Sequence, residues 1–430
     1  MKLARSLLLG TTAAVLLAAA PTGAHAGAFG SRAQSTIALG QAFAGNASGA
    51  AGVTSAFWNP ATITMRPGYN SEYNFTYVDA SARINVLAPT PTLPLGNTGE
   101  LAQSGLAPAS ATSYQITDQV WLGLTTGAPY GNITKPNETW AGQTYSRSSR
   151  VISLSFAPII GIKVTDWLSI GAGPSLEYFK VRLRSAAGVA GPAAAGNVLL
   201  EGDEWNAGVL AGVTITPMAG TDLGFGFRSG VNHDLEGTLR TPLGVTPIRV
   251  NLTLPDTFTF GLTQAISSNF RVNLGFEWQT WSNLQTPIIT LRNGSTPVVP
   301  FPLNYKDGYL FSLGGEYQYD PRWTLRAGVA YEISPIDVSN RSTRLPDTDR
   351  IYTSVGASYA WNDKLTINAS YAHIFSVGNN RVQITPGNPL YNGLPFFGIA
   401  NADVNYFSAG FRYRWDDPKV AEVSPLIRKF

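Results

Sequence analysis

Side chains that could perform catalysis or bind a metal ion are scarce in this chain. Its 430 residues include three histidines and no cysteine, which excludes disulfide bonds and thiolate metal sites. It contains no Gly-x-Ser-x-Gly nucleophile elbow and no histidine spacing that suits a metal ion. Glycines at Gly224, Gly226 and Gly230 mimic a nucleotide-binding loop, but they lie in an alternating segment. We therefore expect no enzyme active site, no metal and no cofactor.

The composition indicates a chain whose surface contacts lipid. Charged residues make up 13% of the chain, against roughly 25% in a typical soluble domain. The 30 basic and 27 acidic residues leave a net charge of +3, which does not indicate a nucleic-acid partner. After residue 26, no stretch reaches the roughly 18 consecutive apolar residues that a membrane helix needs. Contact with lipid would then be made by strands.

The first 26 residues have the three regions of a secretory signal peptide. Lys2 and Arg5 precede an apolar run at residues 7–20, and Ala24-His25-Ala26 supplies the small-residue cleavage pattern. We expect a signal peptide at residues 1–26, cleavage after Ala26, and export from the cytoplasm.

From about residue 69 onward, apolar side chains recur with a period of two, which is the pattern of β-strands. Within residues 270–278, Val272, Leu274 and Phe276 share one face, and residues 323–332 alternate in the same way. These segments run for about ten residues and carry aromatics at their ends. Both features favour a membrane barrel over a soluble β-sandwich, whose strands end sooner.

Short and long connections alternate between the predicted strands. The long ones are expected near residues 87–109, 132–148, 185–199, 232–253, 284–305, 335–347 and 377–403. Outer-membrane barrels show this asymmetry because their periplasmic turns are short and their extracellular loops are long. The count gives about fourteen strands, an even number, with both ends of the barrel sequence on the periplasmic side.

We therefore predict an all-β fold, a membrane-spanning antiparallel β-barrel at residues 67–416 with a periplasmic tail at residues 417–430. The expected surroundings are the outer-membrane lipid and lipopolysaccharide of a Gram-negative cell. We expect a monomer inserted by the barrel-assembly machinery, with no nucleic-acid partner. A general aqueous porin and an outer-membrane enzyme are alternatives; the enzyme would need a histidine such as His373 beside a serine.

Residues 27–66 do not have the strand pattern. They are rich in Gly, Ala and Ser, and they end in the turn Asn59-Pro60-Ala61. Apolar residues such as Ile37 and Phe43 argue against a disordered linker. We predict a compact hatch inside the lumen, which would require a specific route for solutes.

Six segments of the chain carry a resemblance to one family; they lie at residues 39–45, 59–65, 121–131, 227–231, 254–282 and 345–350. The family that they resemble is the outer-membrane long-chain fatty-acid and aromatic-hydrocarbon transporters of the FadL/TodX group. The second begins with Asn59-Pro60-Ala61, and the last reads Leu-Pro-Asp-Thr-Asp-Arg. Together, in this order, they span nearly the whole mature chain.

The resemblance implies a fourteen-stranded barrel with an N-terminal hatch. It also implies passive import of a hydrophobic cargo, which enters a pocket beside the hatch and leaves sideways where the third strand is kinked. In this sequence Gly127, Pro129 and Gly131 interrupt that strand, and proline lacks the N–H that a ladder needs. The alternative is an ordinary strand end that enters a loop.

The resemblance also assigns cargo-binding positions. It places Arg184 at the arginine that binds a fatty-acid carboxylate, while a surface-facing arginine is the alternative. Ala128 and Phe301 stand where fatty-acid transporters carry a hydroxyl and a lysine. These two departures weaken the argument for a carboxylate cargo and strengthen that for neutral or aromatic hydrophobic compounds.

Overall fold

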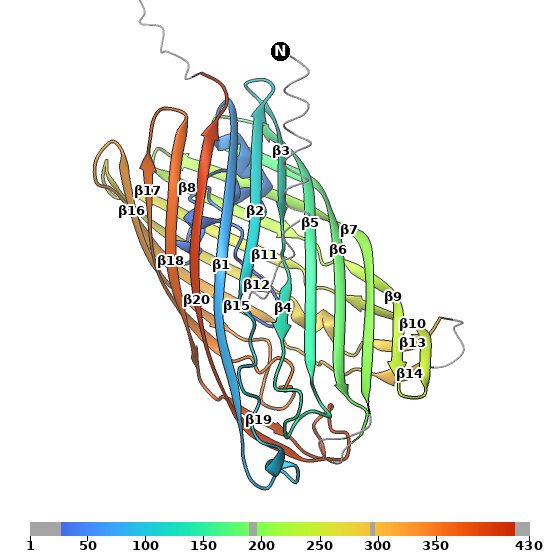
Figure 1. Cartoon of the computed structure of the whole chain (residues 1–430). Coiled ribbons are helices and arrows are strands. Elements are labelled where there is room, and N and C mark those ends of the chain that lie inside the picture. The colour runs from blue at the N-terminus through green and yellow to red at the C-terminus, as the bar shows by residue number, and fades with distance from the viewer. Residues whose placement is uncertain (1–26, 189–195, 293–296, 418–430) are drawn as a thin grey trace, which may run out of the picture.

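The computed structural model describes residues 27–188, 196–292 and 297–417, which form an elongated β-barrel (Figure 1). The predicted signal peptide and residues 418–430 of the predicted tail lie outside the described residues. No helix in the described ranges is long and apolar enough to span a membrane. The 20 strand segments in these ranges belong to one sheet, and their pairings are antiparallel.

Fourteen strands close the barrel, as the alternation of turns and loops predicted. In chain order they are β1 (Tyr69–Val86), β2 (Gly105–Gln115), β3 (Val120–Gly127), β5 (Ser148–Lys163), β6 (Leu168–Ala186), β7 (Asn197–Met218), β8 (Thr221–Arg228), β11 (Thr257–Ala265), β12 (Phe270–Gln279), β15 (Gly308–Gln318), β16 (Trp323–Ile333), β17 (Asp349–Ala360), β18 (Leu365–Val377) and β20 (Phe396–Arg414). The ring closes where β20 pairs with β1, from Asn70 opposite Arg414 to Val86 opposite Gly398.

Six further strands extend this ring. They are β4 (Gly131–Thr134), β9 (Asn232–Thr241), β10 (Gly244–Thr253), β13 (Ile288–Leu291), β14 (Pro297–Pro300) and β19 (Arg381–Ile384). The prediction of long loops at residues 232–253 and 284–305 was therefore wrong in part, because β9, β10, β13 and β14 form a sheet there. Leu235, Ile248 and Val250 alternate with polar residues and are buried, which stabilises strands at these positions.

The outer wall of the barrel is apolar. In β16, Leu325, Val329 and Tyr331 are exposed, whereas Arg326 faces Glu316 and is largely buried. Tryptophans near the strand ends, among them Trp167, are also exposed. This is the pattern of a lipid-facing wall with interfacial aromatics.

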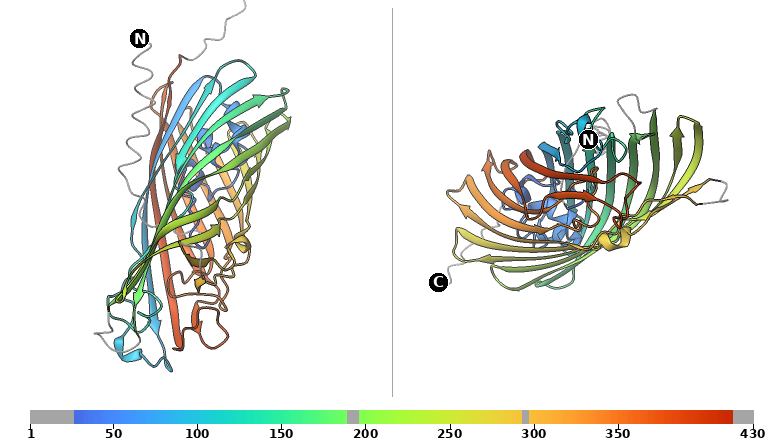
Figure 2. Two further views of the ribbon diagram at one scale, coloured as in Figure 1. Left: turned by 90° about the vertical axis from the view of Figure 1, so that its right-hand side faces the viewer. Right: turned by 90° about the horizontal axis from the view of Figure 1, so that it is seen from below.

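Residues 27–66 lie inside the barrel wall, where Figure 2 shows them from below. They form the short helices α2 (Thr36–Leu39), η1 (Gly52–Phe57) and η2 (Pro60–Met65), and almost all of them are buried. Glycines in the barrel strands allow the backbone of residues 27–66 to approach the wall closely. A Cβ atom added at Gly224 would lie 1.7 Å from the Ala47 carbonyl oxygen, and one at Gly212 would lie 2.0 Å from the Asn59 side-chain oxygen.

Candidate functional site

The third barrel strand is interrupted near its middle. β3 and β4 both pair with β5, but the register shifts between them: Gly127 lies opposite Ser155 and Gly131 opposite Ile152, so three residues of this strand face two of β5. Gly127 is the last residue of β3, Pro129 lies in the break, and Gly131 is the first residue of β4. Because β4 resumes pairing with the same neighbour, the interruption is a kink within the wall.

The N-terminal segment pairs with the inner side of this kink. The Ser31 amide donates to the Pro129 carbonyl at 2.7 Å, and the Gly131 amide donates to the Phe29 carbonyl at 2.8 Å. Gly30 and Tyr130 lie opposite each other between these two bonds. Residues 29–31 therefore satisfy backbone groups that the wall strands leave at the break.

Asn59 ties the N-terminal segment to the barrel wall. Its side-chain oxygen accepts from the Ala61 amide at 3.0 Å and so caps η2, in which Pro60 takes the first helical position. Its side-chain nitrogen donates to the carbonyls of Ala47 at 2.7 Å and of Val213, in β7, at 2.9 Å. The Asn59 side chain is completely buried and uses both donors and its acceptor.

A buried ionic cluster holds the start of the same segment. Arg32 pairs with Glu277 at 2.8 Å and with Glu332 at 2.6 Å. The Gly27 nitrogen donates to Glu332 at 2.7 Å, and the Ala28 amide donates to Asp347 at 2.9 Å. Arg32 and its two carboxylate partners are nearly inaccessible to solvent, so their loss would leave unpaired buried charge.

Phe29 of the N-terminal segment is also one of the residues that line a large apolar cavity. Its volume is about 550 Å³, within the roughly 300–1,000 Å³ of small-molecule sites. Apolar side chains from β6, β9, β10 and β13 line it, together with loop residues. They include Phe179, Val181, Leu183, Leu235, Ile248, Val250, Leu252, Leu284, Ile289, Leu303 and Tyr305. Phe29 connects the cavity to the kink, because its ring contacts Phe179 and Tyr130.

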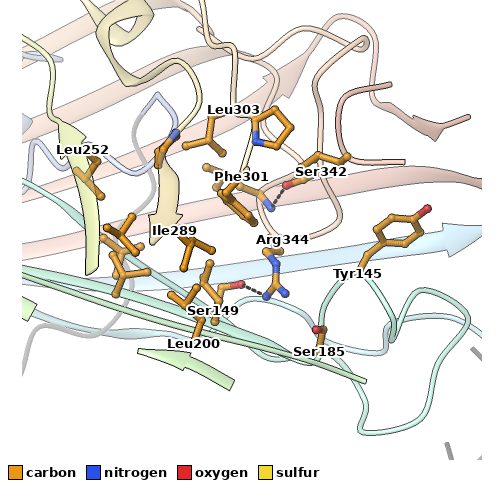
Figure 3. Close-up of a pocket in the computed structure, with 18 of the residues that line it drawn as sticks. Tyr145, Ser149, Ser185, Leu200, Leu252, Ile289, Phe301, Leu303, Ser342 and Arg344 are labelled. Atoms are coloured by element: carbon orange, nitrogen blue, oxygen red, sulfur yellow. Dashed lines mark hydrogen bonds between the residues drawn. The ribbon is translucent and has the colours of Figure 1, made fainter. Parts of the chain in front are cut away.

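Arg344 is the basic residue among those that line the cavity (Figure 3). One of its terminal nitrogens, Nη1, donates to the Ser148 carbonyl at 3.0 Å, the Ser149 hydroxyl at 3.1 Å and the Arg184 carbonyl at 3.1 Å. Removal from water lowers the pKa of Arg344 to about 10, so the side chain is still protonated at neutral pH. It comes from the connection between β16 and β17, which folds back into the lumen. Sequence reasoning missed this residue, although it directly precedes the Leu345-Pro346-Asp347 motif.

The predicted cargo-binding residues are separated by the structure. Alternate residues of β6 line the cavity, namely Phe179, Val181, Leu183 and Ser185, which places the side chain of Arg184 on the opposite face. There Arg184 forms an ion pair with Glu138. The other two predicted positions, Ala128 and Phe301, do not lie beside Arg184 on this face.

Phe301 lines the cavity, whereas Ala128 lies in the kink. The Ala128 carbonyl accepts a bond from the side chain of Gln34 at 3.2 Å. Ala128 therefore contacts the N-terminal segment, and Phe301 is the member of the predicted trio that lines the cavity.

The fold and this cavity define a class of protein, an outer-membrane β-barrel that encloses a folded segment and an apolar cavity. Residues 17–418 match the family described as outer membrane protein transport protein (OMPP1/FadL/TodX), and the chain belongs to that family. Its membership agrees with the resemblance found in the sequence.

Named relatives handle different hydrophobic compounds. The long-chain fatty acid transport protein of Salmonella typhi is 26% identical over 87% of this chain and 94% of its own length. A FadL homologue of Pseudomonas aeruginosa has a similar structure, with a TM-score of 0.81 and 21% identity over 90% of this chain and all of its own. The Ralstonia pickettii toluene transporter TbuX aligns with a TM-score of 0.65 and 17% identity, over 89% of this chain and 98% of its own.

Proposed function

We propose that this protein imports long-chain fatty acids or similar hydrophobic compounds across the outer membrane by passive diffusion. The observation that carries the proposal is the apolar cavity, which Phe29 of the N-terminal segment lines beside the kink of β3. Cargo enters the cavity from the outer loops. Displacement of residues 27–66, which act as a hatch, then opens a path to the kink and sideways into the membrane.

The physical chemistry of the cargo supports this route. Each buried CH₂ group stabilises the bound state by roughly 0.8 kcal/mol, so a long acyl chain favours apolar surroundings throughout its passage. A path from the cavity through the wall into lipid avoids exposing that chain to water. The aromatic-hydrocarbon alternative shares this advantage, and the apolar Ala128 and Phe301 are compatible with it.

Replacement of Asn59 by alanine tests the hatch. The substitution removes the η2 cap and leaves the carbonyls of Ala47 and Val213 without this donor, which loosens the segment at a cost of about 1–3 kcal/mol. We expect uptake of a labelled long-chain fatty acid by cells that express the variant to fall severalfold. Asn362→Ala, at an exposed turn, is the matched control and should transport at the wild-type rate. Unchanged uptake by a correctly inserted Asn59→Ala protein would contradict a gating role.

Single-channel conductance separates this proposal from a general porin. A barrel whose lumen holds residues 27–66 should give small or no currents in planar bilayers. Large, stable currents through the wild-type protein would favour the aqueous porin instead.

A further inference from the structure

Arg344 is a cation in an apolar cavity without an acidic partner. Its three hydrogen bonds to residues that the structure describes all leave from Nη1, and their acceptors are two carbonyls and a hydroxyl. In the described part of the chain no carboxylate forms an ion pair with it, and its lowered pKa has desolvation as its sole cause. Nε and Nη2 remain available for a ligand. A partly desolvated, uncompensated charge is costly, and an anion that enters the cavity would offset this cost.

Neighbouring charged residues are already compensated. Arg184 and Arg147 both lie within ion-pair distance of Glu138. Glu201, the acidic residue that lines the cavity, pairs with Arg182 at 3.9 Å and with Arg240 at 3.7 Å. Arg344 is therefore the lining residue whose charge a ligand could complement.

The shape of the cavity adds a length requirement. From Ser185 beside Arg344, the lining residues of β6 continue inward through Leu183 and Val181 to Phe179, which contacts Phe29. Six residues of strand correspond to roughly 20 Å at about 3.3 Å per residue. A single aromatic ring would occupy a small part of this length, whereas a long acyl chain would follow it.

We infer that Arg344 receives the carboxylate of a long-chain fatty acid, whose acyl chain then extends along β6 toward Phe29. The planar guanidinium presents Nε and Nη2 as two donors in the fork geometry that suits a carboxylate. This inference rests on the proposed function and specifies its cargo as an acyl anion rather than a neutral hydrocarbon. It also assigns to Arg344 the role that the sequence had suggested for Arg184.

Two ligands of equal chain length test this assignment, because they differ only in charge. Binding of tritiated hexadecanoate and hexadecan-1-ol to the purified full chain at pH 7.5 would be measured by scintillation proximity. Arg344→Met keeps an unbranched apolar side chain and removes the charge, so hexadecanoate affinity should fall about 10- to 100-fold while that for the alcohol changes less than about twofold. Arg344→Lys should recover part of the affinity for the acid. Arg184→Met is the matched control and should affect neither ligand.

Each other outcome has a distinct meaning. Equal losses for the acid and the alcohol in Arg344→Met, or no loss for either, would overturn the role of Arg344 and leave hydrophobe import intact. A selective loss for the acid in Arg184→Met would return that role to Arg184. Failure of the wild-type protein to bind either ligand would instead contradict the proposed function itself.

Discussion

Individual glycines determine how closely the N-terminal segment fits against the barrel wall. Gly224 in β8 faces the backbone of Ala47, and Gly171 in β6 faces the backbone of Pro60 and Ala61. At both positions a methyl group would overlap backbone atoms, which cannot move aside as a flexible side chain could. Only glycine fits at these wall positions, because the backbone of residues 27–66 lies against them.

Gly224→Ala should therefore displace residues 27–66 from the barrel wall. Overpacking at such a site costs about 1–3 kcal/mol, and we expect faster tryptic cleavage after Arg32, which is buried in the wild-type protein. Gly188→Ala, where an added methyl group meets no atom within 4 Å, should remain as resistant as wild type. The heat-dependent electrophoretic mobility of each variant reports whether the barrel itself is intact. Full protection of Arg32 in an intact Gly224→Ala barrel would show that the contact does not hold the segment.

At the scale of elements, the kinked third strand and the N-terminal segment form one unit. Residues 29–31 pair with the kink, while the ionic cluster around Arg32 and Glu332 attaches the same stretch to β12 and β16. The cluster also involves Tyr352, whose hydroxyl donates to Glu332 at 2.5 Å. Release of the segment from the kink must therefore overcome both sets of contacts.

Glu332→Gln should weaken this attachment. The change leaves the charge of Arg32 only partly compensated, because Glu277 remains its partner. We expect the amides of residues 27–31 to exchange with deuterium at least about tenfold faster, as measured by mass spectrometry of the N-terminal peptide. Glu100→Gln breaks an exposed pair with Arg83 and should leave this exchange unchanged. Equal exchange in wild type and Glu332→Gln would exclude the cluster as an anchor.

For the whole molecule, local patterns predicted the barrel and a compact segment inside it, but not the contacts that this segment and the inner loops make. The period-two alternation at residues 270–278 and 323–332 corresponds to β12 and β16, because a wall between lipid and lumen imposes that period on each strand. The alternation of short and long connections predicted the number of strands in the barrel. The sequence predicts a loop at residues 232–253, where β9 and β10 form a hairpin, because Pro247 lies within β10 and proline is depleted in strands.

The interior depends on contacts between residues far apart in the sequence. Arg344 reaches the cavity because the β16–β17 connection folds inward onto Ser149 and the Arg184 carbonyl. Alternation along β6 indicates that Arg184 points away from residues 183 and 185. Which of the two faces is the inner one depends on how β6 pairs with β5 and β7, and the sequence does not show this pairing. The pairing of residues 29–31 with the kink leaves no periodic signal in either segment.

The proposed route requires the N-terminal segment to leave the kink, and a reversible cross-link tests this most directly. Gly30 and Tyr130 are an antiparallel pair flanked by two hydrogen bonds, an arrangement in which Cα atoms lie about 4.5 Å apart, within disulfide range. The chain has no native cysteine, so Gly30→Cys/Tyr130→Cys would form one defined bond, with each single variant as a control. Uptake of labelled hexadecanoate would be measured before and after reduction. The proposed route predicts at least a tenfold loss of uptake in the oxidised double variant and recovery on reduction, whereas equal uptake by the fully cross-linked and reduced forms would contradict it.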